Sequence, residues 1–159
     1  MKKYTILNTP LGLLTIQTSD KGLCGAWFET HTTRPEQLGE RDDENPILTK
    51  ACAQLVEYFD GHRAVFDLPI DTQGTDFQKR VWNVLQKIPY GKLCTYQDVA
   101  DNIGNPKAVR AVGAANGKNP LSIIVPCHRV IGKSGKLTGY AGGVERKAAL
   151  LDLEQSETE

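Results

Sequence analysis

The chain has 159 residues and no apolar run approaching the length of about 18 to 20 residues that crosses a bilayer. The apolar stretch after its basic start is interrupted by Thr5, Asn8 and Pro10, whereas a signal peptide has an unbroken apolar core of roughly 7–15 residues. The sequence therefore predicts a cytoplasmic protein without a membrane partner.

A C-x-x-C pair is also lacking, which argues against a thioredoxin-like redox centre and a zinc knuckle. A chain of this length with 40% hydrophobic residues can bury a core without disulfide staples. The ordinary interpretation of a free cysteine is a small buried apolar side chain, and we adopt it for three of the four. The cysteines are Cys24, Cys52, Cys94 and Cys127.

Net charge is lacking as well, since 19 Lys+Arg balance 19 Asp+Glu, and this excludes a uniformly basic, histone-like protein. The halves nevertheless differ, with seven basic and eleven acidic residues in 1–75 against twelve and eight in 76–159. Between Lys79 and Lys147, twelve basic residues accompany only three acidic ones. Such a stretch is typical of a binder of phosphate backbones, and an ordinary solvated surface is the equal alternative.

The first half of the sequence predicts a small sheet with one helix. Three β-rich runs, Tyr4–Leu7, Leu13–Gln17 and Leu23–Phe28, are separated by glycine-containing turns. Asn45-Pro46 is a helix start, and apolar residues then recur at helical spacing until Gly61. A further strand is predicted over Ala64–Ile70.

The second half is predicted to be helical. Thr75-x-x-Gln78 is a capping box that starts one helix, and Thr95-x-x-Asp98 caps a shorter one over Tyr96–Ile103. Gly104 stops that helix, and Asn105-Pro106 starts the next, which runs to about Gly117. The two short helices form a candidate helix-turn-helix over 96–117, for which a plain αα corner is the alternative.

The second of these helices has an almost bare surface, from which Lys107 and Arg110 protrude. A helix that reads the major groove usually carries Asn, Gln, Arg or Ser. A smooth helix with one long cation fits the narrow minor groove better, and tight packing against another helix is the alternative. The small residues are Ala108, Ala111, Gly113, Ala114 and Ala115.

A candidate nucleophile follows the apolar, partly β-branched run Leu121–Val125, which predicts a strand. Cys127 comes directly after Pro126, and at a tight bend backbone N–H groups and the imidazole of His128 would lower the thiol pKa and populate thiolate at neutral pH. His128 would then need a carboxylate to fix its tautomer. The downstream candidates are Glu145, Asp152 and Glu154.

Several motifs occur in a fixed order through the second half. They are Phe77-Gln78-x-x-Val81-Trp82, Ile88-Pro89-x-Gly91, Thr95-Tyr96, Gly104-Asn105-Pro106, Arg110-Ala111-Val112-Gly113, Asn119-Pro120, Pro126-Cys127-His128-Arg129-Val130-Ile131-Gly132, Gly139-Tyr140-Ala141-Gly142-Gly143 and Leu150-Leu151-x-x-Glu154. In this order they resemble the O6-alkylguanine-DNA alkyltransferases of bacterial type. The first half matches weakly beyond Thr9-Pro10-Leu11-Gly12.

The expected fold is α/β (α+β), with a small sheet-plus-helix lobe followed by a helical, winged-helix-like DNA-binding lobe. The expected boundaries are an N-terminal lobe over 1–70, a linker over 71–75, an alkyltransferase lobe over 76–154 and a frayed tail over 155–159.

The resemblance implies direct repair of O6-alkylguanine, and also of O4-alkylthymine, by irreversible transfer of the alkyl group to Cys127. His128 would act as a base through a bound water, and Glu154 would orient it. The product is a thioether without an activated carbonyl, so one molecule would repair one lesion. No cofactor or metal is implied for this chain, because Cys24, His31 and His62 lack the second cysteine of relatives that bind zinc.

The resemblance also implies how the lesion and the DNA are held. A monomer would bind double-stranded DNA through the minor groove and rotate the damaged base out of the stack. Tyr96 would hydrogen-bond that base, Arg110 would fill its place, Asn119 would order the cysteine loop, and Gly139–Gly143 would cover the base. Further base contacts would come from Val130, Tyr140 and Ala141, and DNA contacts from Lys107, Arg110, Ala111, Ala114 and Arg129.

Ala141 departs from relatives that have serine there, so only its backbone N–H could reach guanine O6. Three other functions fit the sequence less well. A damage-binding protein without chemistry would lack the cysteine, a Cys-His hydrolase would leave Tyr96 and Arg110 unexplained, and a helix-turn-helix transcription factor would need polar base-reading side chains in place of the alanines.

Overall fold

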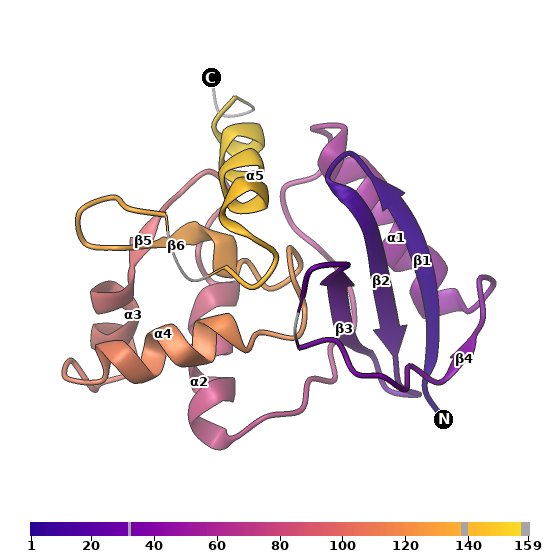
Figure 1. Cartoon of the computed structure of the whole chain (residues 1–159), viewed down its shortest axis with the longest axis horizontal. Coiled ribbons are helices and arrows are strands. Elements are labelled where there is room, and N and C mark those ends of the chain that lie inside the picture. Colours follow the sequence, from indigo (N-terminus) through magenta and orange to yellow (C-terminus); the bar gives the residue numbers. More distant parts are fainter. Residues whose placement is uncertain (32, 138–139, 157–159) are drawn as a thin grey trace.

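The computed structural model describes residues 1–31, 33–137 and 140–156. A sheet lobe built from the first half lies beside a helical lobe built from the second, with the loop and helix that end the chain between them (Figure 1). The mixed α/β class and the order of the two lobes are those that the sequence predicts. The four cysteines are free thiols.

The sheet lobe contains the three predicted strands and one short additional strand. Their order across the sheet is β3-β2-β1-β4, with β1 antiparallel to β2, β2 antiparallel to β3, and β4 parallel to β1. The predicted helix is also present, because the Asn45 side chain accepts hydrogen bonds from two N–H groups at its start. The elements are β1 (Lys3–Thr9), β2 (Gly12–Thr18), β3 (Leu23–Phe28), β4 (Glu40–Arg41) and α1 (Pro46–Phe59).

The helical lobe contains four α-helices and a two-stranded parallel ribbon. Both predicted capping boxes form, at Thr75 and at Thr95, and fix the starts of two helices. The indole N–H of Trp82 donates to the carbonyl of Ala115 at 2.8 Å and ties the first helix to the third. The elements are α2 (Asp76–Gln86), β5 (Cys94–Thr95), α3 (Tyr96–Asn102), α4 (Val109–Gly117), β6 (Val130–Ile131) and α5 (Val144–Ser156).

Two helix boundaries differ from the prediction. The helix expected from Asn105-Pro106 begins at Val109, because the chain first makes a turn in which Ala108 N–H donates to the carbonyl of Asn105 at 3.0 Å. The last helix continues through Ser156, although fraying was expected from residue 155, and the Gln155 side chain donates to the carbonyl of Gly91 at 2.8 Å. Residues 157–159 of the expected tail lie outside the described part.

Two predicted strands are wrong. Over Ala64–Ile70, only Ile70 forms an isolated β-bridge. The Gln54 side chain forms hydrogen bonds with both the N–H and the C=O of Asp67, so these groups are not available to a neighbouring strand. Over 121–125 the chain turns instead, and Leu121 alone forms a bridge. In both segments β propensity is outweighed by a side-chain amide that satisfies the backbone locally.

The two lobes are joined at the free edge of the sheet. Ala26 N–H in β3 donates to the carbonyl of Pro120 at 2.7 Å, and Ser122 N–H donates back to the carbonyl of Ala26 at 3.2 Å. The segment that leads to Cys127 is therefore held by the edge strand of the sheet lobe. No helix in the described ranges is long and apolar enough to traverse a membrane.

Candidate active site

Cys127 begins a single 3-10 turn, Cys127–Arg129, rather than following a strand, and is 5% exposed. The preceding loop is organised by Asn119, whose side-chain N–H groups donate to the carbonyls of Val125 at 2.9 Å and Leu121 at 3.3 Å. Its side-chain oxygen accepts the N–H of Leu121 at 3.0 Å. Asn119 thus organises residues 119–126, the segment before the cysteine that we call the cysteine loop.

The same loop contains Ile123 with a φ of 75°, the only positive φ outside glycine in the described residues. A β-branched residue is strained in that region, at a cost on the order of 1–3 kcal/mol, and persists only when its surroundings fix the backbone. The bonds from Asn119 on either side and the burial of Ile123 supply that fixing.

The resting thiol is not the thiolate that the sequence predicts. Burial raises the pKa of Cys127 to about 11, although a hydrogen bond from Asn119 and the charge of Lys147 act in the opposite direction. A pKa of about 11 leaves on the order of 10⁻⁴ of the sulfur ionised at pH 7. A base must therefore remove the proton at the time of reaction.

His128, the next residue along the chain, is the candidate for such a base. Its ring is fully buried, and its Nε2 lies 2.6 Å from Oε2 of Glu154. Burial lowers the pKa of the imidazole, and the hydrogen bond to Glu154 opposes that shift without reversing it, so the ring is neutral at pH 7. Because an ionised carboxylate only accepts, Nε2 holds the proton and Nδ1 has the lone pair. Nδ1 is buried and has no hydrogen-bond partner among the described residues.

Glu154 is the centre of a buried polar cluster. It accepts from the hydroxyl of Tyr58 at 2.6 Å, the N–H of Gly91 at 3.3 Å, and Nε and Nη2 of Arg129 at 2.8 and 3.0 Å. Burial alone would raise its pKa, but the hydrogen bonds from His128 and Arg129 outweigh burial and lower the pKa to about 2. The carboxylate is therefore ionised across the physiological range and keeps His128 in one tautomer.

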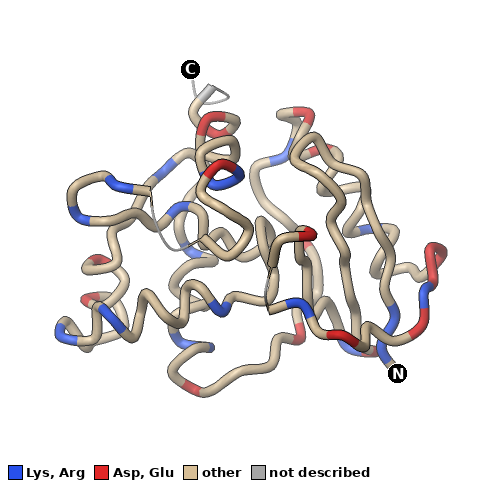
Figure 2. Tube along the Cα trace, viewed as in Figure 1, with Lys and Arg blue, Asp and Glu red and all other residues tan. Residues whose placement is uncertain are grey.

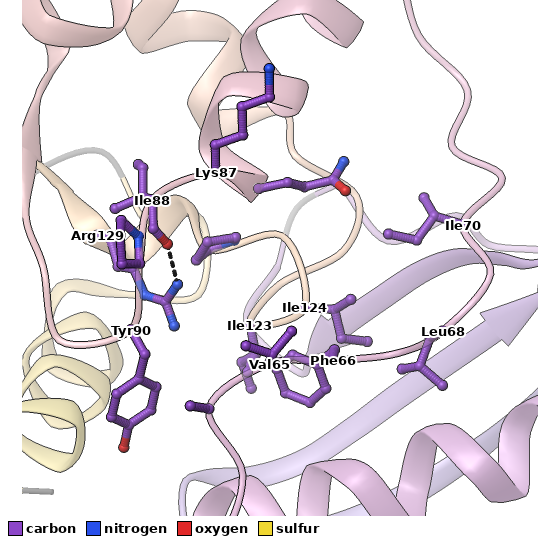
Figure 3. A pocket seen from close by; sticks show the side chains of 14 residues that line it. Val65, Phe66, Leu68, Ile70, Lys87, Ile88, Tyr90, Ile123, Ile124 and Arg129 are labelled. Atoms are coloured by element: carbon purple, nitrogen blue, oxygen red, sulfur yellow. Dashed lines mark hydrogen bonds between the residues drawn. The ribbon is translucent and has the colours of Figure 1, made fainter.

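Arg129 corrects one expectation, since it was predicted to contact DNA. Its side chain is buried, and besides pairing with Glu154 it donates from Nη1 to the carbonyl of Ile88 at 2.7 Å (Figure 3). It lines a cavity of about 300 Å³ beside the cysteine loop, bounded also by Phe66, Ile123 and Ile124. The guanidinium is turned inward because it neutralises the buried carboxylate of Glu154.

Lys147 belongs to the site but was not found from the sequence. It is fully buried, and its ammonium donates to the carbonyl of Val130 and lies 5.9 Å from the ring centre of Tyr96. Burial lowers its pKa to about 8, and the neighbouring Cys127 has the opposite effect. The signal was helical spacing: Lys147, Leu150 and Glu154 share the buried face of α5, which identifies Lys147 as an inward cation.

The expected base-contacting residues are placed around this centre. Tyr140 is buried, its hydroxyl is hydrogen-bonded to the hydroxyl of Ser122, and its pKa is raised by burial and by nearby Cys127. Ala141 is half-buried, and Val130 lies fully buried in β6. Gly139, the first residue of the expected cover, lies outside the described residues.

The expected DNA-contacting residues lie on the outer face of the helical lobe. Lys107, Arg110, Ala111 and Ala114 are exposed on α4 and the turn before it, while Val112, Ala115 and Asn116 face inward. Tyr96 is half-buried at the start of α3. Figure 2 shows basic residues along this lobe, whereas an acidic group over Glu40–Glu44 marks the far edge of the sheet lobe. No three His, Cys, Asp or Glu side chains within the described ranges could hold a metal ion.

Two family models match the chain and together span nearly all of it. Residues 2–72 match "6-O-methylguanine DNA methyltransferase, ribonuclease-like domain", and residues 76–156 match "6-O-methylguanine DNA methyltransferase, DNA binding domain". Two lobes with a buried Cys-His-Glu cluster in the second define a DNA-binding protein of the alkyltransferase class. The chain belongs to the 6-O-methylguanine DNA methyltransferase family.

Individual relatives agree with this assignment. The methylated-DNA--protein-cysteine methyltransferase of Mycolicibacterium paratuberculosis is 48% identical over 98% of this chain and 93% of its own length. The constitutive enzyme of that name in Bacillus subtilis is 46% identical over 98% of this chain and 96% of its length. A crystal structure of Mycobacterium tuberculosis OGT in complex with DNA superposes with a TM-score of 0.91, at 47% identity over 98% of this chain and 94% of that one.

Proposed function

We propose that this protein repairs alkylated DNA by moving the alkyl group from O6 of guanine to the sulfur of Cys127, once per molecule. The observation that supports this most directly is the buried His128-Glu154 pair next to the buried Cys127, in which Nδ1 of the neutral His128 has no partner among the described residues. A neutral imidazole thus follows directly, along the chain, a thiol that is protonated at rest. Membership of the family supplies the substrate class.

The reaction is an in-line displacement at a saturated carbon. The thiol proton passes to Nδ1 of His128 through one water, the Cys127 sulfur forms a bond to the alkyl carbon, and the bond from that carbon to O6 breaks. The electron pair of the broken bond stays on the guanine, and the hydroxyl of Tyr96 stabilises that charge by donating a hydrogen bond to a ring nitrogen. The positive charge of Lys147 favours the developing thiolate.

The DNA is held by the exposed face of α4. A guanine inside a duplex cannot reach a sulfur that is 5% exposed, so the base is rotated out at a cost of a few kcal/mol. The small residues Ala111 and Ala114 allow close approach to the minor groove, and Arg110 takes the place of the extruded base. Contacts of this kind contain little sequence information, which suits a monomeric protein that searches for damage at any site.

Transfer of a labelled methyl group tests the proposal. Duplex DNA with labelled O6-methylguanine is mixed with the protein, and the label should move to Cys127 and saturate at one group per active chain. Cys127→Ser should bind the same duplex and take up no label, while Cys52→Ser, a matched change on α1, should transfer normally. Continuous turnover would indicate a hydrolase instead, and binding without transfer by the wild type would indicate a damage recogniser without chemistry.

A further inference from the structure

Arg146 links three separate parts of the chain. It lies in the first turn of α5, and its Nε donates to the carbonyl of Leu11 at 2.9 Å. Its Nη1 donates to the hydroxyl of Thr30 at 2.7 Å and to the carbonyl of Gly142 at 3.0 Å. The guanidinium also lies over the ring of Phe28, 4.5 Å from its centre.

These contacts do not serve the helix itself. A cation in the first turn of a helix is disfavoured by the positive N-terminal end of the helix dipole, whereas the neighbouring Glu145 is favoured there. Arg146 contacts instead join the sheet lobe, through Leu11, Phe28 and Thr30, to the loop that precedes α5. We define residues 140–143 as the 140–143 loop; in Figure 1 it lies below α5, on the side facing β3.

The 140–143 loop contains Tyr140, a residue of the candidate active site. Tyr140, its first residue, is hydrogen-bonded to Ser122 of the cysteine loop, and its pKa responds to the nearby Cys127. A side chain at Gly142 would meet the Tyr140 ring at 2.6 Å and the His31 ring at 2.9 Å, so the loop and the aromatic rings are closely packed. The position of the Tyr140 ring therefore depends on where Gly142 is fastened.

The loop borders open space. A groove of about 860 Å³ is lined by the loop itself, by the first turn of α5 including Arg146, and by Pro10, Leu11 and Thr30. The Arg146 side chain forms hydrogen bonds with both the loop and these sheet-lobe residues. Without the hydrogen bonds of Arg146, Gly142 is held to the sheet lobe by the longer 3.4 Å hydrogen bond from the Thr30 hydroxyl, so the loop and the Tyr140 ring packed against Gly142 can shift.

We propose that Arg146 is a positioning residue, which fastens the 140–143 loop to the sheet lobe and so sets both the rate of alkyl transfer and the size of alkyl group accepted. This inference rests on the proposed function. The inference also gives the sheet lobe a role. Ala26 in β3 holds the cysteine loop, and Thr30, shortly after β3, holds the 140–143 loop through Arg146.

Arg146→Met tests the inference, because methionine keeps an unbranched apolar stem and removes every hydrogen bond. Single-turnover transfer from duplexes with O6-methylguanine should slow on the order of tenfold or more, since small misplacements of reacting groups have effects of that size. Transfer of the larger group from O6-benzylguanine in the same duplex should slow less, so that the benzyl-to-methyl rate ratio rises. Lys21→Met, which removes an exposed cation of the sheet lobe, should leave both rates unchanged.

A second variant keeps the test valid if Arg146→Met folds poorly. Thr30→Val removes one acceptor of Arg146 and also the 3.4 Å hydrogen bond that the Thr30 hydroxyl donates to the carbonyl of Gly142. It should change both rates in the same direction as Arg146→Met, by a smaller factor, because Arg146 keeps its bonds to Leu11 and Gly142. Affinity for undamaged duplex should stay within twofold. Unchanged rates, or equal losses for both alkyl groups, would overturn the inference, whereas a wild type that transfers nothing would instead overturn the proposed function.

Discussion

Replacing Glu154 with glutamine is the most informative single change to the buried cluster. The substitution keeps the shape of the side chain but removes its charge, and it places an NH₂ group among atoms that are themselves donors. Those donors are the Tyr58 hydroxyl, Nε2 of His128 and the guanidinium of Arg129. Arg129, with a side chain 7% exposed, would then be a buried cation without its partner.

Two independent arguments give the size of the effect. Removing one partner of a buried ion pair usually costs about 3–5 kcal/mol of folding free energy. The pKa of Glu154 falls from its ordinary 4.5 to about 2, and at 1.36 kcal/mol per unit this corresponds to about 3 kcal/mol of stabilisation at neutral pH. A typical domain has a free energy of unfolding of roughly 5–15 kcal/mol, so the variant should still fold but with much lower stability.

Urea unfolding followed by the fluorescence of the buried Trp27 and Trp82 measures this directly. At pH 7, Glu154→Gln should lose about 3 kcal/mol, while Asp152→Asn, an exposed change on the same helix, should stay within about 0.5 kcal/mol.

The pH dependence has a definite sign. A carboxylate with a lowered folded-state pKa stabilises the fold above its unfolded pKa, and this contribution is lost as the pH falls from about 4.5 towards 2. The gap between wild type and Glu154→Gln should therefore close over that window. A gap below 1 kcal/mol at pH 7, or one that stays constant down to pH 2, would refute the reasoning.

Three further predictions concern single side chains. Arg110→Ala should slow repair in duplex DNA at least tenfold more than repair of free alkylguanine, measured as two second-order rates, because Arg110 acts only where a base leaves a stack. Lys147→Met should move the rising limb of the transfer-rate profile to higher pH, because the charge that lowers the pKa of Cys127 is gone; an unchanged profile would count against that role. Burial lowers the pKa of His31 to about 4, so wild-type stability should fall as the pH drops from 6.5 to 4, by about 3 kcal/mol at most. Unfolding titrations of His31→Asn, whose side-chain oxygen can still accept the Phe28 N–H, should lack this loss.

Local signals in the sequence predicted most helices and the first three strands. The capping boxes at Thr75 and Thr95 and the Asn45 cap act within one turn, so the sequence contains all that is needed to identify them. The predicted strands over 64–70 and 121–125 fail for a different reason. There the side-chain amides of Gln54 and Asn119 form hydrogen bonds with the backbone in place of a neighbouring strand. Which side chain forms these bonds depends on the packing of the whole chain.

Residue type and motif identified the candidate site, but tertiary structure decided its electrostatics. The neighbours of Cys127 in the sequence predict a thiolate, but burial is the largest influence on the pKa of the thiol, and burial depends on the tertiary structure. The sequence places Arg129 among the residues expected to contact DNA, and Lys147 at the end of the basic stretch. Both side chains are turned inward by partners that lie far along the chain, Glu154 for Arg129 and the carbonyl of Val130 for Lys147. A count of charged residues cannot distinguish such cations from solvated ones.

The high pKa of the Cys127 thiol has a consequence for how long the protein remains usable. Oxidation by peroxides proceeds through thiolate and needs access to solvent, and a sulfur that is both protonated and shielded offers little of either. If each molecule is spent in one repair, as proposed, a sulfur damaged before it meets a lesion is a molecule lost. Delaying ionisation until a substrate is in place therefore preserves the stock of competent protein between rare encounters.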